Sequence, residues 1–108
     1  MALCEGGKLR NWSSVFGSGF SFYCPGCKCA HTLPVAGGYT ERWGFNGDTV
    51  KPTFTPSVLV FHEKDGQRVT ECHSFVTDGR IQFLNDSAHE LAGQTVDLPL
   101  WPENYGGP

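Results

Sequence analysis

The chain has 108 residues, the size of one domain, and at this size a metal ion is still a useful stabilising cross-link. Its formal net charge is −3 and its eight Lys and Arg residues are scattered, so we expect no nucleic-acid partner. No run of eighteen apolar residues could cross a membrane, and the first residues lack the apolar core of a signal peptide. We therefore expect one cytosolic domain over residues 1–108, in the cytoplasm of a host cell.

The elements expected along the chain are mostly strands. Fourteen glycines, seven prolines and a 13% aromatic fraction, with turn signals at short spacing, favour a small, mainly β domain. Residues 1–11 are expected to form an irregular arm. Residues 20–23 alternate and lead into Cys24-Pro25-Gly26-Cys27, and residues 30–35 leave it, which is the arrangement of a zinc-ribbon-like knuckle. Gly26 is expected to supply a positive φ in this turn.

The second half of the chain predicts an antiparallel β meander. Residues 58–62 and 68–76 alternate around an Asp-Gly hairpin signal, and a turn at 77–79 leads into a strand at 80–84. A last strand is expected at 95–98.

One short helix is expected over residues 87–92. Asp86 or Ser87 would cap it, with Glu90 three residues after Ser87 completing a capping box and Gly93 ending the helix. The final segment, 101–108, is expected to be a second irregular arm, with its aromatic residues either folded onto the body or presented to a partner.

The Cys-x-x-Cys turn is the strongest chemical signal in the sequence. Five cysteines, an odd number, without a secretion signal favour thiolate chemistry over disulfides. Cys24 and Cys27 can both reach one zinc ion, at about 2.3 Å each, but other ligands must complete the site. The pair Cys72-His73 is the expected source. Cys29 is read as a bystander, although it lies close enough to be a spare ligand.

The histidines leave several alternatives open. Because Cys72 and His73 are adjacent on a strand, their side chains point to opposite faces unless a bulge aims both at one metal. A hydrogen-bonded core histidine is the other reading of His73. Helical spacing would put the Asp86 carboxylate beside His89, which makes His89 a candidate ligand and Asp86 a candidate base. His31 is read equally as a ligand or as a surface residue.

The expected metal-ligating residues are therefore Cys24, Cys27, Cys72, His73 and His89, with Asp86 as the candidate catalytic residue. Such a set can form a structural zinc site, or a hydrolytic one if a position stays open for water. A cysteine peptidase built from Cys72, His89 and Asp86 is a third route. The sequence assigns no role to Ser57.

Several motifs in fixed order resemble those of a family of small uncharacterised phage and prophage proteins. The motifs are Cys24-Pro25-Gly26-Cys27 with a following His31, Trp43, Phe45-Asn46-Gly47-Asp48, Lys51-Pro52-Thr53-Phe54-Thr55-Pro56-Ser57, Cys72-His73-Ser74-Phe75 and Asp86-Ser87-Ala88-His89-Glu90-Leu91-Ala92-Gly93-Gln94-Thr95-Val96. Some members carry the automated label "ammonia monooxygenase", which does not suit a chain without a membrane segment. The resemblance also implies that relatives occur beside bacterial ubiquitin-like conjugation genes, where a zinc-dependent peptidase is suspected.

Two functions follow from these observations. The first is a small zinc-binding phage or prophage protein that docks on a protein partner, a host or defence component. The second is a zinc-dependent peptidase that acts on a ubiquitin-like protein or its conjugates. The number of protein ligands around the metal discriminates between them, because a hydrolytic site needs an open position.

Overall fold

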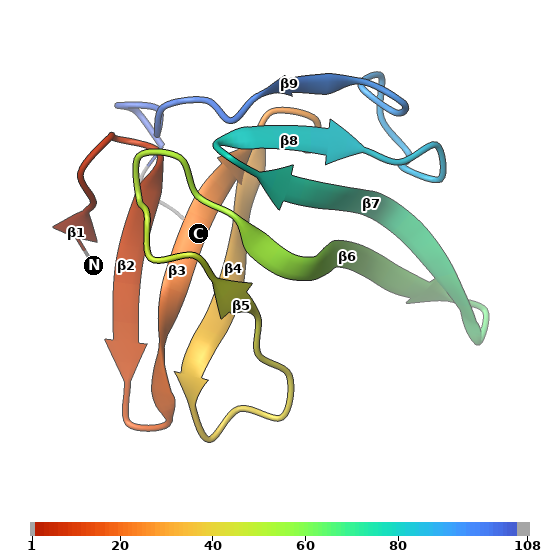
Figure 1. Cartoon of the computed structure of the whole chain (residues 1–108). Coiled ribbons are helices and arrows are strands. Elements are labelled where there is room, and N and C mark those ends of the chain that lie inside the picture. Colours follow the sequence, from red (N-terminus) through yellow and green to blue (C-terminus); the bar gives the residue numbers. More distant parts are fainter. Residues whose placement is uncertain (1, 106–108) are drawn as a thin grey trace.

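Two antiparallel sheets pack face to face in the computed structural model, which describes residues 2–105 (Figure 1). The first sheet contains, in spatial order, β1 (Ala2–Leu3), β2 (Leu9–Ser14), β3 (Gly17–Cys24) and β4 (Cys29–Gly37). The second contains β5 (Gly44–Phe45), β6 (Phe54–Lys64), β7 (Gln67–Thr77), β8 (Arg80–Phe83) and β9 (Thr95–Asp97). The expected β-rich fold class and the β6–β7–β8 meander are confirmed.

The hydrophobic core fills the space between the two sheets. It is built from alternate residues of the facing strands, as period-two patterning requires. The fully buried members include Phe22 and Leu33 of the first sheet and Phe54, Val76 and Ile81 of the second. Every second side chain of β6 and β7 therefore points away from the core, on the outer face of the second sheet.

Two hairpins of the second sheet close through two-residue turns, Asp65-Gly66 and Asp78-Gly79. All four residues have positive φ, between 50° and 78°, which defines type I′ turns. The second loop was expected to include Thr77, but Thr77 is paired with Arg80 on the neighbouring strand. A shift of one residue exchanges the two faces of a strand, so this difference decides which residues surround His73.

The corrected register moves His73 out of the core. Ile81 is opposite Val76, and Phe83 is opposite Ser74, all on the buried inner face. His73 shares the outer face with Phe75, whose side chain is 42% exposed. The reading of His73 as a core histidine is therefore wrong.

The helix expected over residues 87–92 is replaced by turns. The Ser87 hydroxyl, one of the two expected caps of the helix, bonds instead to the backbone of His73 on β7. The amide of Ala88 donates to the carbonyl of Glu71 at 2.9 Å. These contacts to β7 occupy the groups that a first helical turn would need, so the segment follows the sheet.

Both terminal arms are more ordered than expected. The N-terminal arm contains β1, and β2 already begins at Leu9. Within the C-terminal arm, the Trp101 amide donates to the carbonyl of Gly7, and the Tyr105 hydroxyl accepts from the amide of Ala30. The described part of this arm is irregular but folded onto the body, while residues 106–108 lie outside the described residues.

Candidate active site and metal centre

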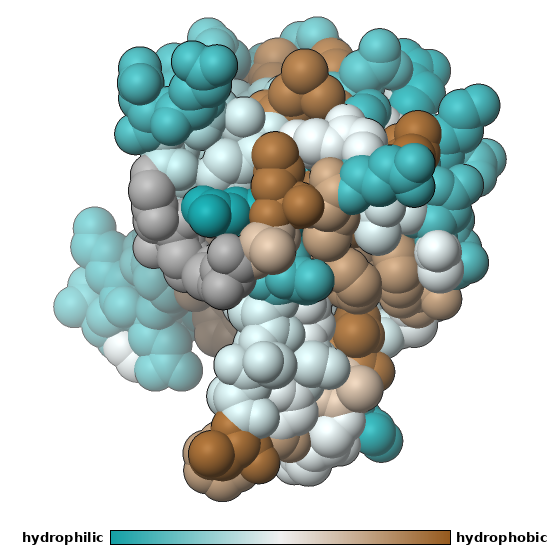
Figure 2. Space-filling view, turned by 90° about the vertical axis from the view of Figure 1, so that its left-hand side faces the viewer, coloured by the Kyte–Doolittle hydropathy of each residue, from teal (hydrophilic) through white to brown (hydrophobic). Residues whose placement is uncertain are grey.

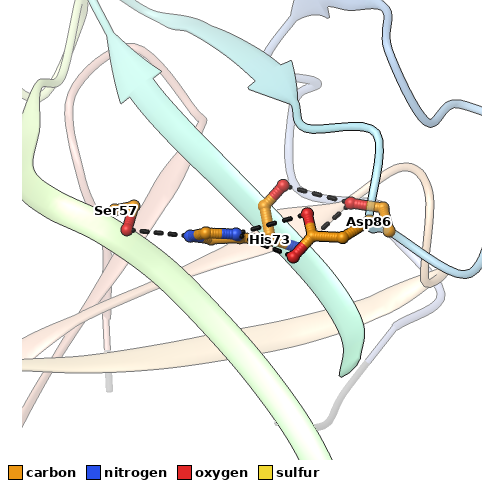
Figure 3. Close-up of polar contacts among 4 residues, drawn as sticks. Ser57, His73 and Asp86 are labelled. Carbon is orange, nitrogen blue, oxygen red and sulfur yellow. Dashed lines mark hydrogen bonds and ion pairs between the residues drawn. The ribbon is translucent and has the colours of Figure 1, made fainter. Parts of the chain in front are cut away.

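Three polar side chains from separate elements meet on the outer face of the second sheet (Figure 3). The hydroxyl of Ser57, on β6, lies 3.0 Å from Nε2 of His73, on β7. The other ring nitrogen of His73, Nδ1, lies 3.1 Å and 3.3 Å from the two carboxylate oxygens of Asp86, which follows β8. These contacts form one continuous chain from hydroxyl to imidazole to carboxylate, the arrangement of a Ser-His-Asp triad.

The hydrogen bonds determine the tautomer of His73. A carboxylate can only accept, so Nδ1 carries the proton and donates to Asp86. In the neutral imidazole, Nε2 then has a free lone pair that faces the Ser57 hydroxyl. The arrangement can therefore remove a proton from Ser57 while Asp86 holds the imidazole in place.

The register of β6 and β7 brings Ser57 and His73 together. His73 is directly opposite Leu59, and opposite residues point to the same face of a sheet. Ser57 is two residues before Leu59, so it shares that face and is the diagonal neighbour of His73. The indole of Trp43 donates to the Ser57 carbonyl at 3.3 Å, and this bond anchors the backbone of Ser57.

Ser87 fastens the Asp86 segment to β7. Its hydroxyl accepts from the amide of His73 at 3.0 Å and donates to the carbonyl of the same residue at 3.1 Å. The amide of Leu84 also donates to that carbonyl, at 2.8 Å. Ser87 is buried, with 8% of its surface exposed. The carboxylate is thus held beside His73 by bonds to the strand that carries His73.

Asp86 was expected beside His89, and the structure places it beside His73 instead. The expectation depended on helical spacing between residues 86 and 89, and these residues are not helical. His89 turns toward Cys72, with 3.4 Å between Nε2 and Sγ. The expected cysteine peptidase set is therefore not brought together, and Cys72 itself is only 1% exposed.

A second cluster lies between the two sheets and contains three cysteines and one histidine. One potential ligand atom from each of four residues lies within 4.8 Å of all the others, and these residues are Cys24, Cys27, His31 and Cys72. The sulfur atoms of Cys24 and Cys72 are 3.9 Å apart. Ligands about 2.3 Å from a tetrahedral ion lie about 3.8 Å from one another, so the spacing suits one metal ion.

The chemistry of these residues also fits a metal ion. Nε2 of His31 is buried and has no hydrogen-bond partner among the described residues, so it is a polar atom that an ion would satisfy. The three thiols oppose one another's ionisation. A hydrogen bond from Cys72 lowers the pKa of Cys24 to about 4, whereas burial raises the pKa of Cys27 to about 12. A divalent cation removes this conflict because it binds all the sulfurs as thiolates.

Of the histidines considered as ligands, the four-residue cluster contains His31, and neither His73 nor His89. His73 lies on the opposite face of β7 from Cys72, as regular strand geometry requires, and is part of the chain with Ser57. His89 accepts from the amide of Leu91 through Nδ1. Its Nε2 therefore carries the proton and donates to the sulfur of Cys72, which supports a thiolate but leaves no lone pair for an ion.

Gly26 has a different role from the expected one. The positive φ of the knuckle belongs to Lys28, with a φ of 58°, and Gly26 is not among the residues with positive φ. A Cβ at position 26 would instead collide with the imidazole ring of His89. Glycine is required here because the His89 ring packs directly on the backbone of the Cys24–Cys27 turn. This packing positions the ring against Cys72.

The family comparison covers most of both sites. A family model described as "Bacterial ubiquitination-like system serine protease (BubE)" matches residues 9–84. The chain belongs to this family. The match includes Ser57, His73 and the four residues of the metal cluster, and it ends two residues before Asp86. No curated protein and no solved structure matches the chain.

Membership of the BubE family associates the chain with bacterial ubiquitination-like systems, which is consistent with protein partners. Within the described residues, no helix is long and apolar enough to span a membrane.

Proposed function

We propose that this BubE chain is a serine protease that cleaves a ubiquitin-like protein or its conjugates. The observation that carries the proposal is the continuous contact from Ser57 through His73 to Asp86, at 3.0 Å and 3.1 Å. The family description, which names a serine protease, supports the same activity. Ser57 is the nucleophile, His73 the general base and acid, and Asp86 the group that orients His73.

The proposed reaction proceeds through an acyl-enzyme. Nε2 of His73 takes the proton of the Ser57 hydroxyl as Oγ attacks the scissile carbonyl. The resulting tetrahedral intermediate collapses, the carbon–nitrogen bond breaks, and His73 gives its proton to the leaving amine. Water then attacks the Ser57 ester in the same manner, releasing the carboxylic acid and restoring the hydroxyl. Asp86 accepts a hydrogen bond from Nδ1 throughout and stabilises the imidazolium.

We also propose that the metal cluster binds zinc in a structural role. A set of three cysteines and one histidine provides four protein ligands, which is typical of closed structural zinc sites. A zinc-dependent peptidase would need an open position for water, and the four-residue cluster does not favour one. The zinc ion would tie Cys72 of the second sheet to the β3–β4 knuckle of the first.

Two substitutions in the triad test the proposed serine chemistry. Hydrolysis of a peptide ester is measured for the protein as purified and for Ser57→Ala and Asp86→Asn. We expect Ser57→Ala to abolish turnover and Asp86→Asn to lower kcat on the order of ten-thousandfold, because an amide can donate to Nδ1 and so favours the wrong tautomer of the imidazole. Unchanged hydrolysis in a folded Ser57→Ala variant would overturn the proposal.

A docking role is a second candidate, supported by an exposed apolar hairpin tip. Val15 is 94% exposed and Phe16 is 69% exposed, at the turn between β2 and β3. Figure 2 shows apolar residues at the lower end of the molecule, where this hairpin ends. If the tip docks a protein partner, Phe16→Ser should weaken cleavage of an intact protein substrate and leave peptide ester hydrolysis unchanged. Equal loss of both activities would contradict this role.

A further inference from the structure

A groove beside Ser57 is not explained by the triad. It has a volume of about 460 Å³ and lies between the segment 40–43 and the outer face of β6. Pro56 and Ser57 lie at one end of the stretch of β6 that lines it, and Leu59 and Phe61 follow along the strand. The four residue-to-residue steps from Ser57 to Phe61 cover about 13 Å, so the groove matches about four or five residues of extended peptide.

The edge of β6 is unpaired along this groove. β5 pairs with β6 only at Phe54 and Thr55, and no described strand pairs with β6 on that side beyond Thr55. The Ser57 carbonyl accepts from the Trp43 indole, so the backbone groups of Ser57 face this edge. Because backbone groups alternate along a strand, those of Leu59 and Phe61 face the same edge. An extended peptide can therefore add its own hydrogen bonds here.

We propose that the substrate binds as an added antiparallel strand on this edge of β6, with the residues before the scissile bond in the groove. This inference rests on the proposed protease function. A chain that runs opposite to β6 passes Phe61 first and brings its carboxyl end to Ser57. On the far side of Ser57 the edge is already covered by β5. Residues after the scissile bond therefore find no strand with which to pair.

The side chains of the groove select for apolar and acidic substrate residues. Its apolar wall consists of Trp43, Leu59 and Phe61. The guanidinium of Arg68 lies over the Phe61 ring, 4.0 Å from the centroid, and Arg42 is on the opposite wall. Neither arginine forms an ion pair within the described residues. Glu41 is the only acidic residue among the described residues that line the groove, so the groove has an excess of positive charge in a chain whose net charge is −3.

A library of acylated tetrapeptide aminocoumarin amides tests whether the protein recognises the residues before the scissile bond. These probes have four residues before the scissile bond and only the coumarin after it. We expect the protein to cleave members of the library and to prefer an acidic residue at one position. Failure to cleave any tetrapeptide amide, together with cleavage of peptides extended beyond the scissile bond, would overturn the inference.

Backbone pairing is tested on the best peptide of that library by methylating one amide nitrogen at a time. Adjacent amides of a bound strand point to opposite sides, so methylation should lower kcat/KM about tenfold at one alternate set and little at the other. Equal tolerance at all positions would exclude strand addition. This test changes only the peptide, so protein folding cannot obscure it.

The charge preference is tested by Arg68→Ala, with Arg80→Ala as the matched control. Arg80 is also an exposed strand arginine, but it lies on β8 and pairs with Asp97. We expect Arg68→Ala to abolish the preference for the acidic residue and Arg80→Ala to retain it. Equal preference in both variants would overturn the charge argument. A fluorophosphonate probe distinguishes failure of this inference from failure of the proposed protease function. Labelling of Ser57 shows that the nucleophile is active even if the groove does not select acidic residues.

Discussion

Ser57 shows at the scale of single residues why the triad was not predicted. It lies on a strand within Thr55-Pro56-Ser57, without the glycine-flanked turn that marks many serine nucleophiles. His73 and Asp86 were both recognised as functional candidates, but each was assigned to another partner. The chain order serine, histidine, aspartate gives no help either, because triads are defined by geometry and not by order.

Ser87 is predicted to be a positioning residue for the triad. Ser87→Ala removes both hydrogen bonds to the His73 backbone and leaves a partly buried amide without its partner, which should cost about 1–3 kcal/mol of unfolding free energy. Because Asp86 also loses its anchor, we expect kcat to fall while KM changes little. Urea unfolding and ester hydrolysis measure the two effects.

Ser87→Thr provides the control for this prediction, since threonine keeps the hydroxyl. Recovery of kcat in that variant supports positioning through the hydroxyl. A fall in stability without any change of kcat in Ser87→Ala would show that Ser87 serves the fold alone.

At the scale of elements, a β-bulge decides which face of β7 carries the histidine. The two-residue turn after Lys64 sets a register that would place His73 opposite Val58, on the inner face. The pairing shifts between Val60 and Phe61, where Glu71 of β7 is the extra residue, and His73 moves opposite Leu59. The strands and turns were predictable from alternation and Asp-Gly signals, but nothing in those signals locates a bulge.

The glycines of the two type I′ turns are predicted to differ in how much an alanine substitution destabilises the fold. Gly66 has a φ of 78°, and a Cβ there would meet nothing within 4 Å. Gly79 has a φ of 77°, but a Cβ there would lie 3.2 Å from the backbone of Lys51. We expect Gly66→Ala to cost about 1–2 kcal/mol of unfolding free energy from the backbone conformation alone, and Gly79→Ala to cost more. Denaturant unfolding of both variants measures the difference, and a larger cost at Gly66 would contradict the account.

At the scale of the whole molecule, the metal cluster joins the two sheets. Three of its residues, Cys24, Cys27 and His31, lie in or beside the β3–β4 hairpin, and only Cys72 belongs to the second sheet. The sequence predicted the three cysteines, because the Cys-x-x-Cys turn has a recognisable spacing. It could not choose among the histidines, because that choice depends on how two separate sheets pack.

Loss of the proposed zinc ion should therefore destabilise the entire chain. We expect purified protein to contain about one zinc ion per chain and Cys72→Ser to lose it, with a large fall in Tm because metal-binding energy at such a site is folding energy. Cys29→Ser is the matched control, since Cys29 lies beside the knuckle but outside the cluster. Metal analysis and thermal unfolding measure the outcome, and zinc retained by a folded Cys72→Ser variant would contradict the assignment.

Covalent trapping tests most directly whether Ser57 is a nucleophile activated by His73. The intact protein is treated with a fluorophosphonate, and the modified residue is located by peptide mass spectrometry. We predict one adduct, on Ser57, that is absent from Ser57→Ala and strongly reduced in His73→Ala, while Ser14, an exposed serine outside the triad, is unmodified. A folded, zinc-containing protein that remains unmodified, or one modified equally in His73→Ala, would contradict the account.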